Sequence, residues 1–176
     1  MNNYSFTKER ELEAFIKEGK FKKILIITGE NSFKKSGADN LFKKILDKNI
    51  VDFFIKKKSY PEIKELKKII DKIKIFSPQL IIAVGGGSVL DYAKIANVLT
   101  YETDIENKVI NTSYKTKKFT KLLGIPTTAG SGAEVTTNAV IYVDNIKYSV
   151  EGSDLRPDFY FLIPELVIGS SMTIKA

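Results

Sequence analysis

The sequence contains neither cysteine nor histidine among its 176 residues. Without cysteine the protein cannot form disulfide bonds or thiolate metal sites, and this composition suits a reducing cytoplasm, where we expect the protein to reside. Catalytic iron and zinc rely on imidazole and carboxylate ligands. Because imidazole is absent and the acidic residues show no ligand spacing, the sequence predicts no metal site.

Long hydrophobic runs and arginine are also scarce. No apolar stretch approaches the roughly 20 residues that span a bilayer, and residues 1–15 lack the apolar core of a signal peptide. Arg10 and Arg156 are the only arginines, although the net charge is +7. The lysines are spread along the chain instead of forming one stripe with aromatic residues. We therefore expect no membrane association and no nucleic-acid partner.

Residues 80–94 combine an apolar run, three glycines and a polar start to a further apolar segment. The run is typical of a strand buried on both faces, and the glycines allow a sharp turn with exposed N–H groups. Ser88 suits the N-cap of a following helix, with Asp91 as a partner resembling a capping box. A helix N-terminus behind a glycine turn binds anions, usually phosphate. A tight turn without a ligand is the alternative.

Two common nucleotide motifs are absent from this turn. No Gly-Lys-Ser/Thr follows the glycines, which excludes a Walker A loop, and the G-x-G-x-x-G spacing of the ordinary Rossmann fingerprint fails. A second segment rich in threonine, serine and glycine occupies residues 124–136. By itself, such a segment is usually a solvated turn.

Together, GGGSVLDYAK and PTTAGSGAE resemble two sequence blocks of the iron-containing (group III) alcohol dehydrogenase family. Residues 24–37 are similar to the family's first strand and turn, and KYS, LRPD and PEL follow in the family's order from Lys147 to Leu166. The resemblance implies an NAD(P)-dependent oxidoreductase that interconverts alcohols and aldehydes by hydride transfer. In the full-length family a helical C-terminal domain holds iron or zinc.

This sequence stops at Ala176, before such a helical domain. The resemblance therefore implies that residues 1–176 are the NAD(P)-binding domain, without a metal, with unidentified catalytic residues and with little or no activity alone. The phosphonoacetaldehyde reductase-like branch is the most similar within the family. Two alternatives stay open: a dehydroquinate synthase or glycerol-1-phosphate dehydrogenase-like domain, and a non-enzymatic nucleotide-binding module.

The resemblance also implies roles for individual residues. Gly86, Gly87 and Ser88 match residues that hold the pyrophosphate through backbone N–H groups, and Asp91 either fixes the turn or contacts the cofactor. The remaining matches are Thr127, Thr128 and Ser131 on the adenine and diphosphate side, Thr136 and Val135 near the nicotinamide, and Lys147 near a ribose. Asp158 and Glu165 are expected to be structural.

The residues after the first strand bear on the choice of cofactor. An acid at this position favours NAD and repels the 2′-phosphate of NADP. Here Gly29 leaves room for that phosphate, Ser32 can donate a hydrogen bond, and Lys34 and Lys35 can neutralise it. Glu30 argues for NAD. On balance the sequence favours NADP.

Alternating strand and helix patterns predict an α/β fold, with a Rossmann-like, doubly wound parallel sheet and an added β-hairpin, similar to the dehydroquinate synthase N-terminal domain. The expected strands are 22–28, 50–56, 80–84, 121–125 and 159–163, the hairpin is 138–144 with 146–150, and the helices are 7–18, 36–48, 61–76 and 88–99. Residues 100–118 are expected to form an exposed loop. The apolar residues 159–164 and 167–174, and the family's pairing through N-terminal strands, predict a homodimer or higher oligomer.

Overall fold

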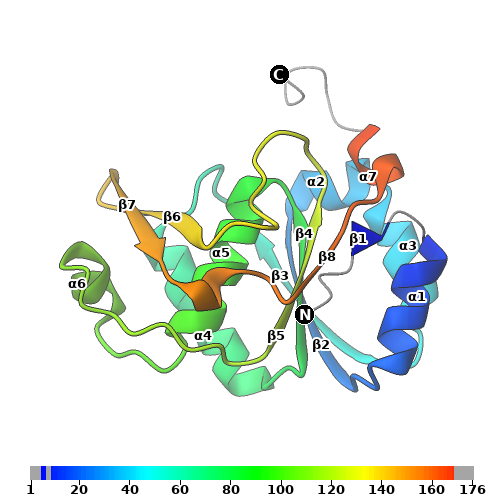
Figure 1. Cartoon of the computed structure of the whole chain (residues 1–176), viewed down its shortest axis with the longest axis horizontal. Helices are drawn as coiled ribbons and strands as arrows, with labels where there is room; N and C mark the ends of the chain where they lie inside the picture. Colours follow the sequence, from blue (N-terminus) through cyan, green and yellow to red (C-terminus); the bar gives the residue numbers. More distant parts are fainter. Residues whose placement is uncertain (1–4, 7–8, 169–176) are drawn as a thin grey trace.

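A computed structural model describes residues 5–6 and 9–168 as two β-sheets with helices around them (Figure 1). The larger sheet has six parallel strands in the order β1-β8-β5-β4-β2-β3, and β6 and β7 form an antiparallel pair. The strands are β1 (Ser5–Phe6), β2 (Lys23–Gly29), β3 (Ile50–Lys56), β4 (Leu80–Gly85), β5 (Lys121–Pro126), β6 (Asn138–Val143), β7 (Ile146–Glu151) and β8 (Phe159–Phe161). The helices are α1 (Glu9–Glu18), α2 (Glu30–Lys35), α3 (Ala38–Ile45), α4 (Ile63–Phe76), α5 (Gly87–Leu99), α6 (Ile105–Ile110) and α7 (Pro164–Ile168), with a 3-10 turn at Ser153–Leu155.

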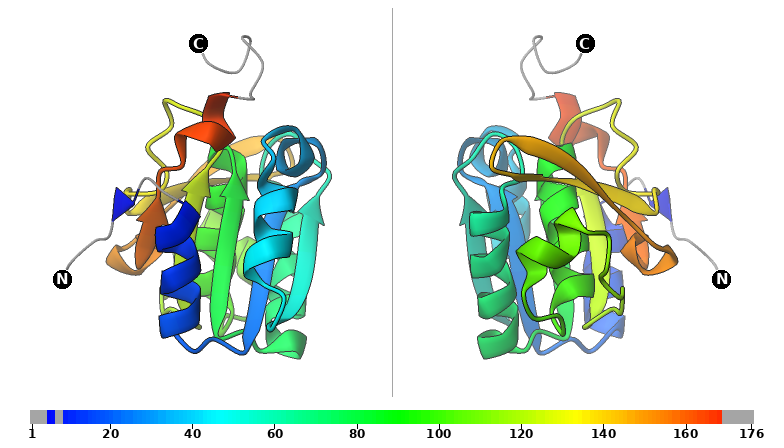
Figure 2. Two further views of the ribbon diagram at one scale, coloured as in Figure 1. Left: turned by 90° about the vertical axis from the view of Figure 1, so that its right-hand side faces the viewer. Right: turned by 90° about the vertical axis from the view of Figure 1, so that its left-hand side faces the viewer.

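The central strands of the large sheet, β2, β4 and β5, are buried on both faces, as the sequence predicts for a doubly wound fold. Alternate residues of the central strand β4 enter two different cores: Ile82 packs with side chains of α1 and α3, and Ile81 packs with those of α4 and α5. Figure 2 shows these helix pairs on opposite sides of the sheet. Because both faces are covered, a continuous apolar run is stable in β4 without alternation.

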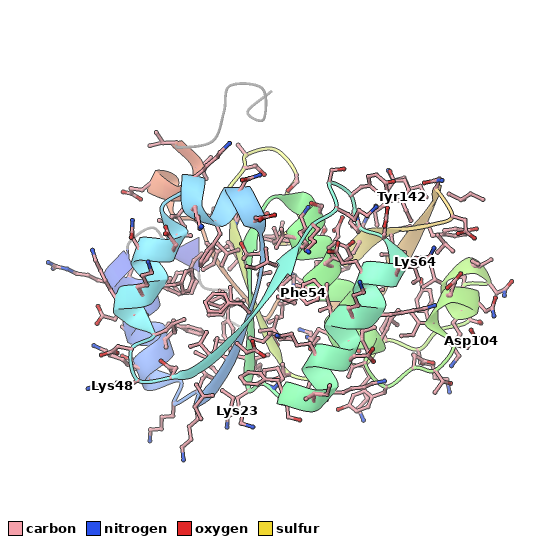
Figure 3. The ribbon with its side chains drawn as sticks, turned by 180° about the vertical axis from the view of Figure 1, so that it is seen from behind. Lys23, Lys48, Phe54, Lys64, Asp104 and Tyr142 are labelled. Atoms are coloured by element: carbon pink, nitrogen blue, oxygen red, sulfur yellow. The ribbon has the colours of Figure 1, made fainter. Side chains whose placement is uncertain are left out.

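The hairpin is confirmed, with its turn at Asp144 and Asn145. Both residues have positive φ angles, 46° and 66°, which a two-residue hairpin turn of type I′ requires and which Asp and Asn tolerate well. The hairpin lies against the start of α4, where the Tyr142 N–H donates to the Pro61 carbonyl over 2.8 Å. Figure 3 shows Tyr142 and Lys64 of α4 at the same end of the molecule.

The prediction of an exposed loop over residues 100–118 is wrong. This segment contains α6, whose Ile105 and Val109 are buried in the core formed with α4 and α5. An ion pair of 2.5 Å between Lys67 and Glu106 joins α4 to α6. The sequence pattern does not reveal this helix because it has only six residues, with only two buried apolar positions one turn apart.

Two helix starts also differ from prediction. The segment expected as a turn after β2 is helix α2, which begins immediately after Gly29. Helix α5 begins at Gly87 with Gly86 as its N-cap, and no side chain caps it. Ser88 is therefore not the N-cap, and Asp91 is not part of a capping box.

The predicted apolar surface at residues 159–164 is mostly covered. Phe161 and Ile163 are fully buried because β8 lies inside the sheet between β5 and β1, whereas Leu162 is 37% exposed. Residues 169–174 of the second apolar segment lie outside the described residues. The exposed large apolar side chains of the sheet lie instead on the edge strand β3, at Ile50, Phe53 and Ile55.

Candidate nucleotide-binding site

The turn between β4 and α5 presents a helix N-terminus at the carboxyl edge of the sheet. Helix α5 has 13 residues, and no side-chain hydrogen bond caps its first turn. The Val89 and Leu90 N–H groups donate back to the Gly86 carbonyl, so the helix is well formed from its start. Donors before that point have no partner within the helix, and they are available to an anion.

The second predicted segment closes over this turn. The Thr127 N–H donates to the Gly85 carbonyl over 3.0 Å, which joins the end of β5 to the end of β4. An ideal Cβ placed on Gly86 would lie 3.1 Å from Thr128 Oγ1, and one on Gly87 would lie 3.2 Å from Ser131 Cβ. The structure thus brings the two segments together, and glycine permits this close approach.

A cleft of about 360 Å³ extends from this turn to the turn after β2. It lies at the carboxyl ends of β2, β3 and β4, where open parallel sheets bind their ligands. Its lining residues are Gly29, Glu30, Asn31, Ser32, Lys56, Lys57, Lys58, Ser59, Gly86, Ser88 and Val89.

The positive side chains at this cleft are not those that the sequence suggested. Lys34 and Lys35 are exposed in the last turn of α2, outside the cleft lining, whereas three consecutive lysines at the end of β3 line it. Lys56 Nζ donates to the Lys58 carbonyl over 2.6 Å, and its partial burial lowers its pKa. The run of three lysines at the end of a strand was visible in the sequence but could not be placed without the strand order.

Gly29 and Ser32 lie together at one wall of the cleft. An ideal Cβ on Gly29 would lie only 2.7 Å from Ser32 Oγ, so an acidic side chain could replace this glycine only if Ser32 moved. Ser32 Oγ has a weak hydrogen bond of 3.4 Å to the Gly29 carbonyl. A small rotation of the hydroxyl would free it for a phosphate oxygen.

Asp91 lies on α5 and faces the β6–β7 hairpin. Burial raises the pKa of Asp91 to about 6, against the opposing effects of Lys94, of a backbone hydrogen bond from Val140 and of Lys147. The predicted residues Asp91 and Lys147 are thus close enough for their charges to interact. Lys147 itself is exposed.

The other predicted residues divide into two groups. Thr136 Oγ1 accepts a hydrogen bond of 2.8 Å from Lys94, and Val135 is 39% exposed. Asp158 has a structural position, since its carboxylate accepts from the Leu122 N–H at 2.9 Å and pairs with Lys118 at 3.1 Å. Glu165 is exposed in the first turn of α7.

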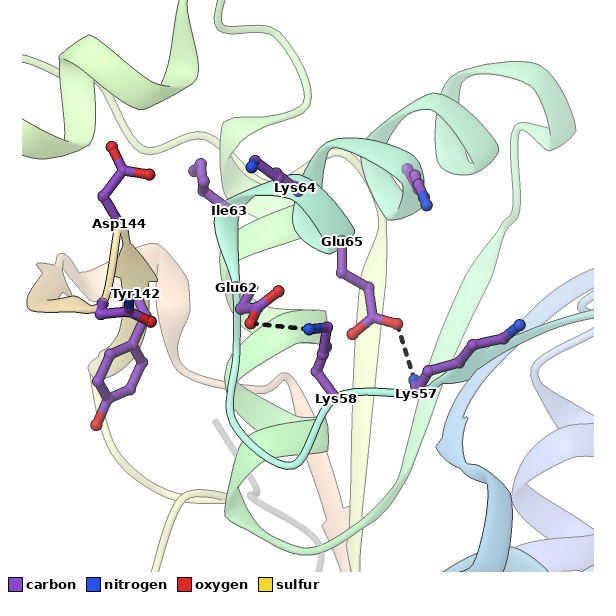
Figure 4. Close-up of a pocket in the computed structure, with 10 residues that line it drawn as sticks. Lys57, Lys58, Glu62, Ile63, Lys64, Glu65, Tyr142 and Asp144 are labelled. Carbon is purple, nitrogen blue, oxygen red and sulfur yellow. Dashed lines mark hydrogen bonds and ion pairs between the residues drawn. The ribbon is translucent and has the colours of Figure 1, made fainter.

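A second cleft, of about 450 Å³, lies between the start of α4 and the hairpin turn (Figure 4). Lys57 and Lys58 line both this cleft and the first one, so the two clefts are neighbours. An ion pair of 3.4 Å joins Lys58 to Glu62, and the Lys57 N–H donates to Glu65 over 2.8 Å. Its acidic and basic side chains largely neutralise one another.

The described part of the chain contains neither a set of metal ligands nor a membrane-spanning helix. No group of three or more Asp, Glu, His or Cys residues there could hold a metal ion. No described helix combines the length and apolarity that crossing a membrane requires. The described residues therefore do not supply the ligands for the iron or zinc that the resemblance to iron-containing alcohol dehydrogenases implies for the full-length family.

Comparison with protein families identifies the family to which the chain belongs. The family model described as iron-containing alcohol dehydrogenase matches residues 3–164. The chain belongs to this family. The expected resemblance is confirmed, and the alcohol dehydrogenase branch is favoured over the dehydroquinate synthase-like alternative.

Individual relatives of this iron-containing alcohol dehydrogenase chain are longer than the chain itself. It is 34% identical over 113 residues to an alcohol dehydrogenase of Thermococcus barophilus, a match that covers 60% of the chain and 30% of the relative. The NADH-dependent butanol dehydrogenase A of Thermotoga maritima has the same fold, with a TM-score of 0.87, 24% identity and coverage of 98% and 45%. A sulfoacetaldehyde reductase of Bifidobacterium kashiwanohense, solved with NAD+, gives a TM-score of 0.83, 21% identity and coverage of 98% and 46%. The chain thus spans less than half the length of these relatives.

Proposed function

We propose that this chain is the dinucleotide-binding part of an NAD(P)-dependent alcohol dehydrogenase. The observation that carries the proposal is the closure of two loops at the carboxyl edge of the sheet. There Thr128 and Ser131 lie against Gly86 and Gly87, in front of an uncapped helix N-terminus. Backbone N–H groups and hydroxyls in this arrangement suit a pyrophosphate.

The residues of the site fit a dinucleotide in three parts. Gly86, Gly87 and Ser88 would hold the pyrophosphate through their N–H groups. Thr127, Thr128 and Ser131 would line the adenine and diphosphate side, and Thr136 with Lys147 would lie toward the nicotinamide and its ribose. The dinucleotide supplies the hydride chemistry when bound, and the chain supplies its orientation.

The cleft favours NADP over NAD in this proposal. Gly29 carries no acid that would repel a 2′-phosphate, Ser32 offers a hydroxyl, and three lysines face the same cleft against the single acid Glu30. Phosphate bound by lysine gains a charge-assisted interaction. NAD is the alternative, because the Thermotoga and Bifidobacterium proteins are described with NADH and NAD+.

We also propose that these 176 residues bind the cofactor without turning over a substrate. The sequence has no histidine, and the described residues contain no cluster that fits iron or zinc. Small alcohols and aldehydes, including phosphonoacetaldehyde-like substrates, are the proposed substrate class of the complete enzyme. A non-enzymatic nucleotide-binding module is the second candidate, and it shares the binding site but not the chemistry.

Titration of the whole chain with NADPH and NADH, followed by nicotinamide fluorescence, tests the proposal. We expect saturable binding of both cofactors, with NADPH binding more tightly. Absence of binding would overturn the function, and tighter NADH would overturn only the choice of NADP. Assays of aldehyde reduction with and without added iron or zinc complete the test, because turnover would contradict the proposal that these 176 residues are inactive alone.

Self-association remains part of the proposal, now supported by a different surface. Ile50, Phe53 and Ile55 are 60%, 40% and 49% exposed on β3, which is an edge strand of the six-stranded sheet. An apolar edge strand can pair with the same strand of a second copy. We expect light scattering to show a dimer or larger assembly; a monomer at high concentration would refute this.

A further inference from the structure

Helix α5 carries Gly87, Asp91 and Lys94 on one face, because residues four and seven positions apart lie one and two turns along a helix. Each of the three faces a different part of residues 128–140. Gly87 lies against Ser131, and Asp91 accepts the hydrogen bond from Val140. Lys94 reaches the segment between these two contacts. The spacing of the GGGSVLDYAK block therefore matches a column of contacts along one helix.

Lys94 is fully buried, with 0% of its surface exposed. Its Nζ atom donates to the Ala133 carbonyl at 3.0 Å, to Thr136 Oγ1 at 2.8 Å and to the Asn138 carbonyl at 2.6 Å. An ammonium group has three donors, and all three are used. All three acceptors lie in residues 133–138, here called the strap, which directly follows the Thr127–Ser131 loop.

Acidic neighbours surround this buried ammonium. Asp91 and Glu134 favour its charged form, although burial lowers the pKa of Lys94 to about 8. Glu134 Oε2 is buried and has no hydrogen-bond partner among the described residues. A neutral side chain at position 94 would leave two carbonyls, one hydroxyl and these carboxylates without their cation. Each buried polar group left unpaired destabilises the folded arrangement.

We propose that Lys94 is a positioning residue for dinucleotide binding, whose ammonium fixes the strap on α5 and thereby holds Thr128 and Ser131 against the glycine turn. Lys94 is sealed from solvent and acts through the strap without touching the cofactor. The inference rests on the proposed function. It adds a specific, charge-dependent connection between the two loops of the site.

Substitution Lys94→Met tests this with similar side-chain volume and no charge. We expect NADPH and NADH to bind at least tenfold more weakly. Hydrogen exchange should increase in residues 127–138 and stay unchanged in β2 and β4. Thr136→Val, which removes one acceptor and keeps the ammonium, should weaken binding by about threefold. If Lys94→Met fails to fold, hydrogen exchange of residues 127–131 in Thr136→Val provides the test, because Thr136 lies toward the proposed nicotinamide position and its effect on affinity alone would not separate the two roles.

Because the protein has no native cysteine, a chemical rescue experiment can separate the charge of the side chain at position 94 from its bulk. In Lys94→Cys, alkylation of the unfolded chain with 2-bromoethylamine rebuilds an ammonium side chain of nearly the same length, and iodoacetamide adds a neutral group. After refolding, the aminoethylated protein should recover affinity to within about threefold of the wild type carried through the same cycle. The iodoacetamide product should not. Lys44→Cys, at an exposed position of α3, is the matched control for the chemistry.

Three outcomes would count against these proposals. Wild-type affinity in a folded Lys94→Met variant overturns the inference and leaves the proposed function intact. Equal rescue by the neutral group also overturns it, since bulk and not charge would then be responsible. Failure of the wild type to bind either dinucleotide overturns the proposed function, and this inference with it.

Discussion

The hydroxyl of Tyr92 donates a hydrogen bond of 2.7 Å to Oε2 of Glu65. The Tyr92 hydroxyl oxygen in turn accepts a hydrogen bond from the Glu62 N–H over 2.7 Å. Tyr92 is fully buried on α5, whereas Glu65 is in the first turn of α4. Helix α5 therefore holds the start of α4 as well as the strap. Lys56, Lys57 and Lys58, which line the cleft, shortly precede the start of α4 in the sequence.

Removal of this hydroxyl should destabilise the protein. In Tyr92→Phe, a backbone N–H and a carboxylate lose their shared partner, which we expect to cost about 1–3 kcal/mol in the free energy of unfolding. Urea unfolding measures this cost. Tyr101→Phe, at a tyrosine that is 58% exposed, is the matched control and should change stability by less than about 0.5 kcal/mol. Equal effects of the two substitutions would contradict the role of Tyr92.

Asp91 should make stability depend on pH. Burial raises its pKa from 3.8 to about 6, so between these values the folded protein keeps a proton that the unfolded chain has released. The stability contributed by this group is complete below pH 4 and falls as the pH rises through 6. At 1.36 kcal/mol for each pKa unit, the loss is up to about 3 kcal/mol.

The substitution Asp91→Asn removes this titration. We expect the variant to become more stable relative to the wild type, with a larger free energy of unfolding, as the pH rises from 4 to 7. Urea unfolding at four pH values in this range gives the difference. A difference that does not vary with pH would show that Asp91 has an ordinary pKa.

The lysines of the cleft should control NADPH affinity. In the double substitution Lys57→Ala and Lys58→Ala, we expect NADPH to bind about tenfold more weakly, equivalent to about 1.4 kcal/mol, and NADH to change little. Lys34→Ala with Lys35→Ala removes the same charge outside the cleft and is the control. If both pairs weaken NADPH equally, a general surface potential and not this cleft attracts the phosphate.

The close approach at Gly87 gives a graded prediction. Alanine adds a Cβ about 3.2 Å from Ser131 Cβ, and valine adds two further methyl groups in the same space. Dinucleotide binding should weaken moderately in Gly87→Ala and by at least tenfold in Gly87→Val. Thermal unfolding of both variants separates this effect from a loss of fold. Retained affinity in Gly87→Val would show that the glycine turn is not part of the site.

Local features of the fold were predictable because short-range chemistry sets them. The apolar run of β4 is long enough to indicate burial on both faces, and Asp144-Asn145 is a turn pair that tolerates positive φ. The start of α5 was misplaced by one residue for a local reason too. Gly86 serves as the N-cap without any side-chain bond, so the serine that normally marks such a start was misleading.

Contacts between distant segments were not predictable from the sequence. Lys94 and Ala133 are 39 residues apart, and nothing in the local pattern shows that the lysine points inward. The lysines at the end of β3 could be assigned to the cleft only with the strand order β4-β2-β3, which brings the ends of these strands together. Lys34 and Lys35 are nearer in sequence to Gly29 but are exposed in the last turn of α2.

The position of β8 has a consequence for how the chain folds during synthesis. Ser5 pairs with Tyr160 and Phe6 with Phe161, so β1 and its partner β8 lie far apart in the sequence. At about 5–20 residues per second, β1 waits roughly 10 to 30 seconds before β8 emerges. Strands β2, β3 and β4 can pair long before that. This edge of the sheet therefore closes after β2, β3 and β4 can pair, and a chaperone that binds β1 would have the interval between the synthesis of β1 and that of β8 in which to act.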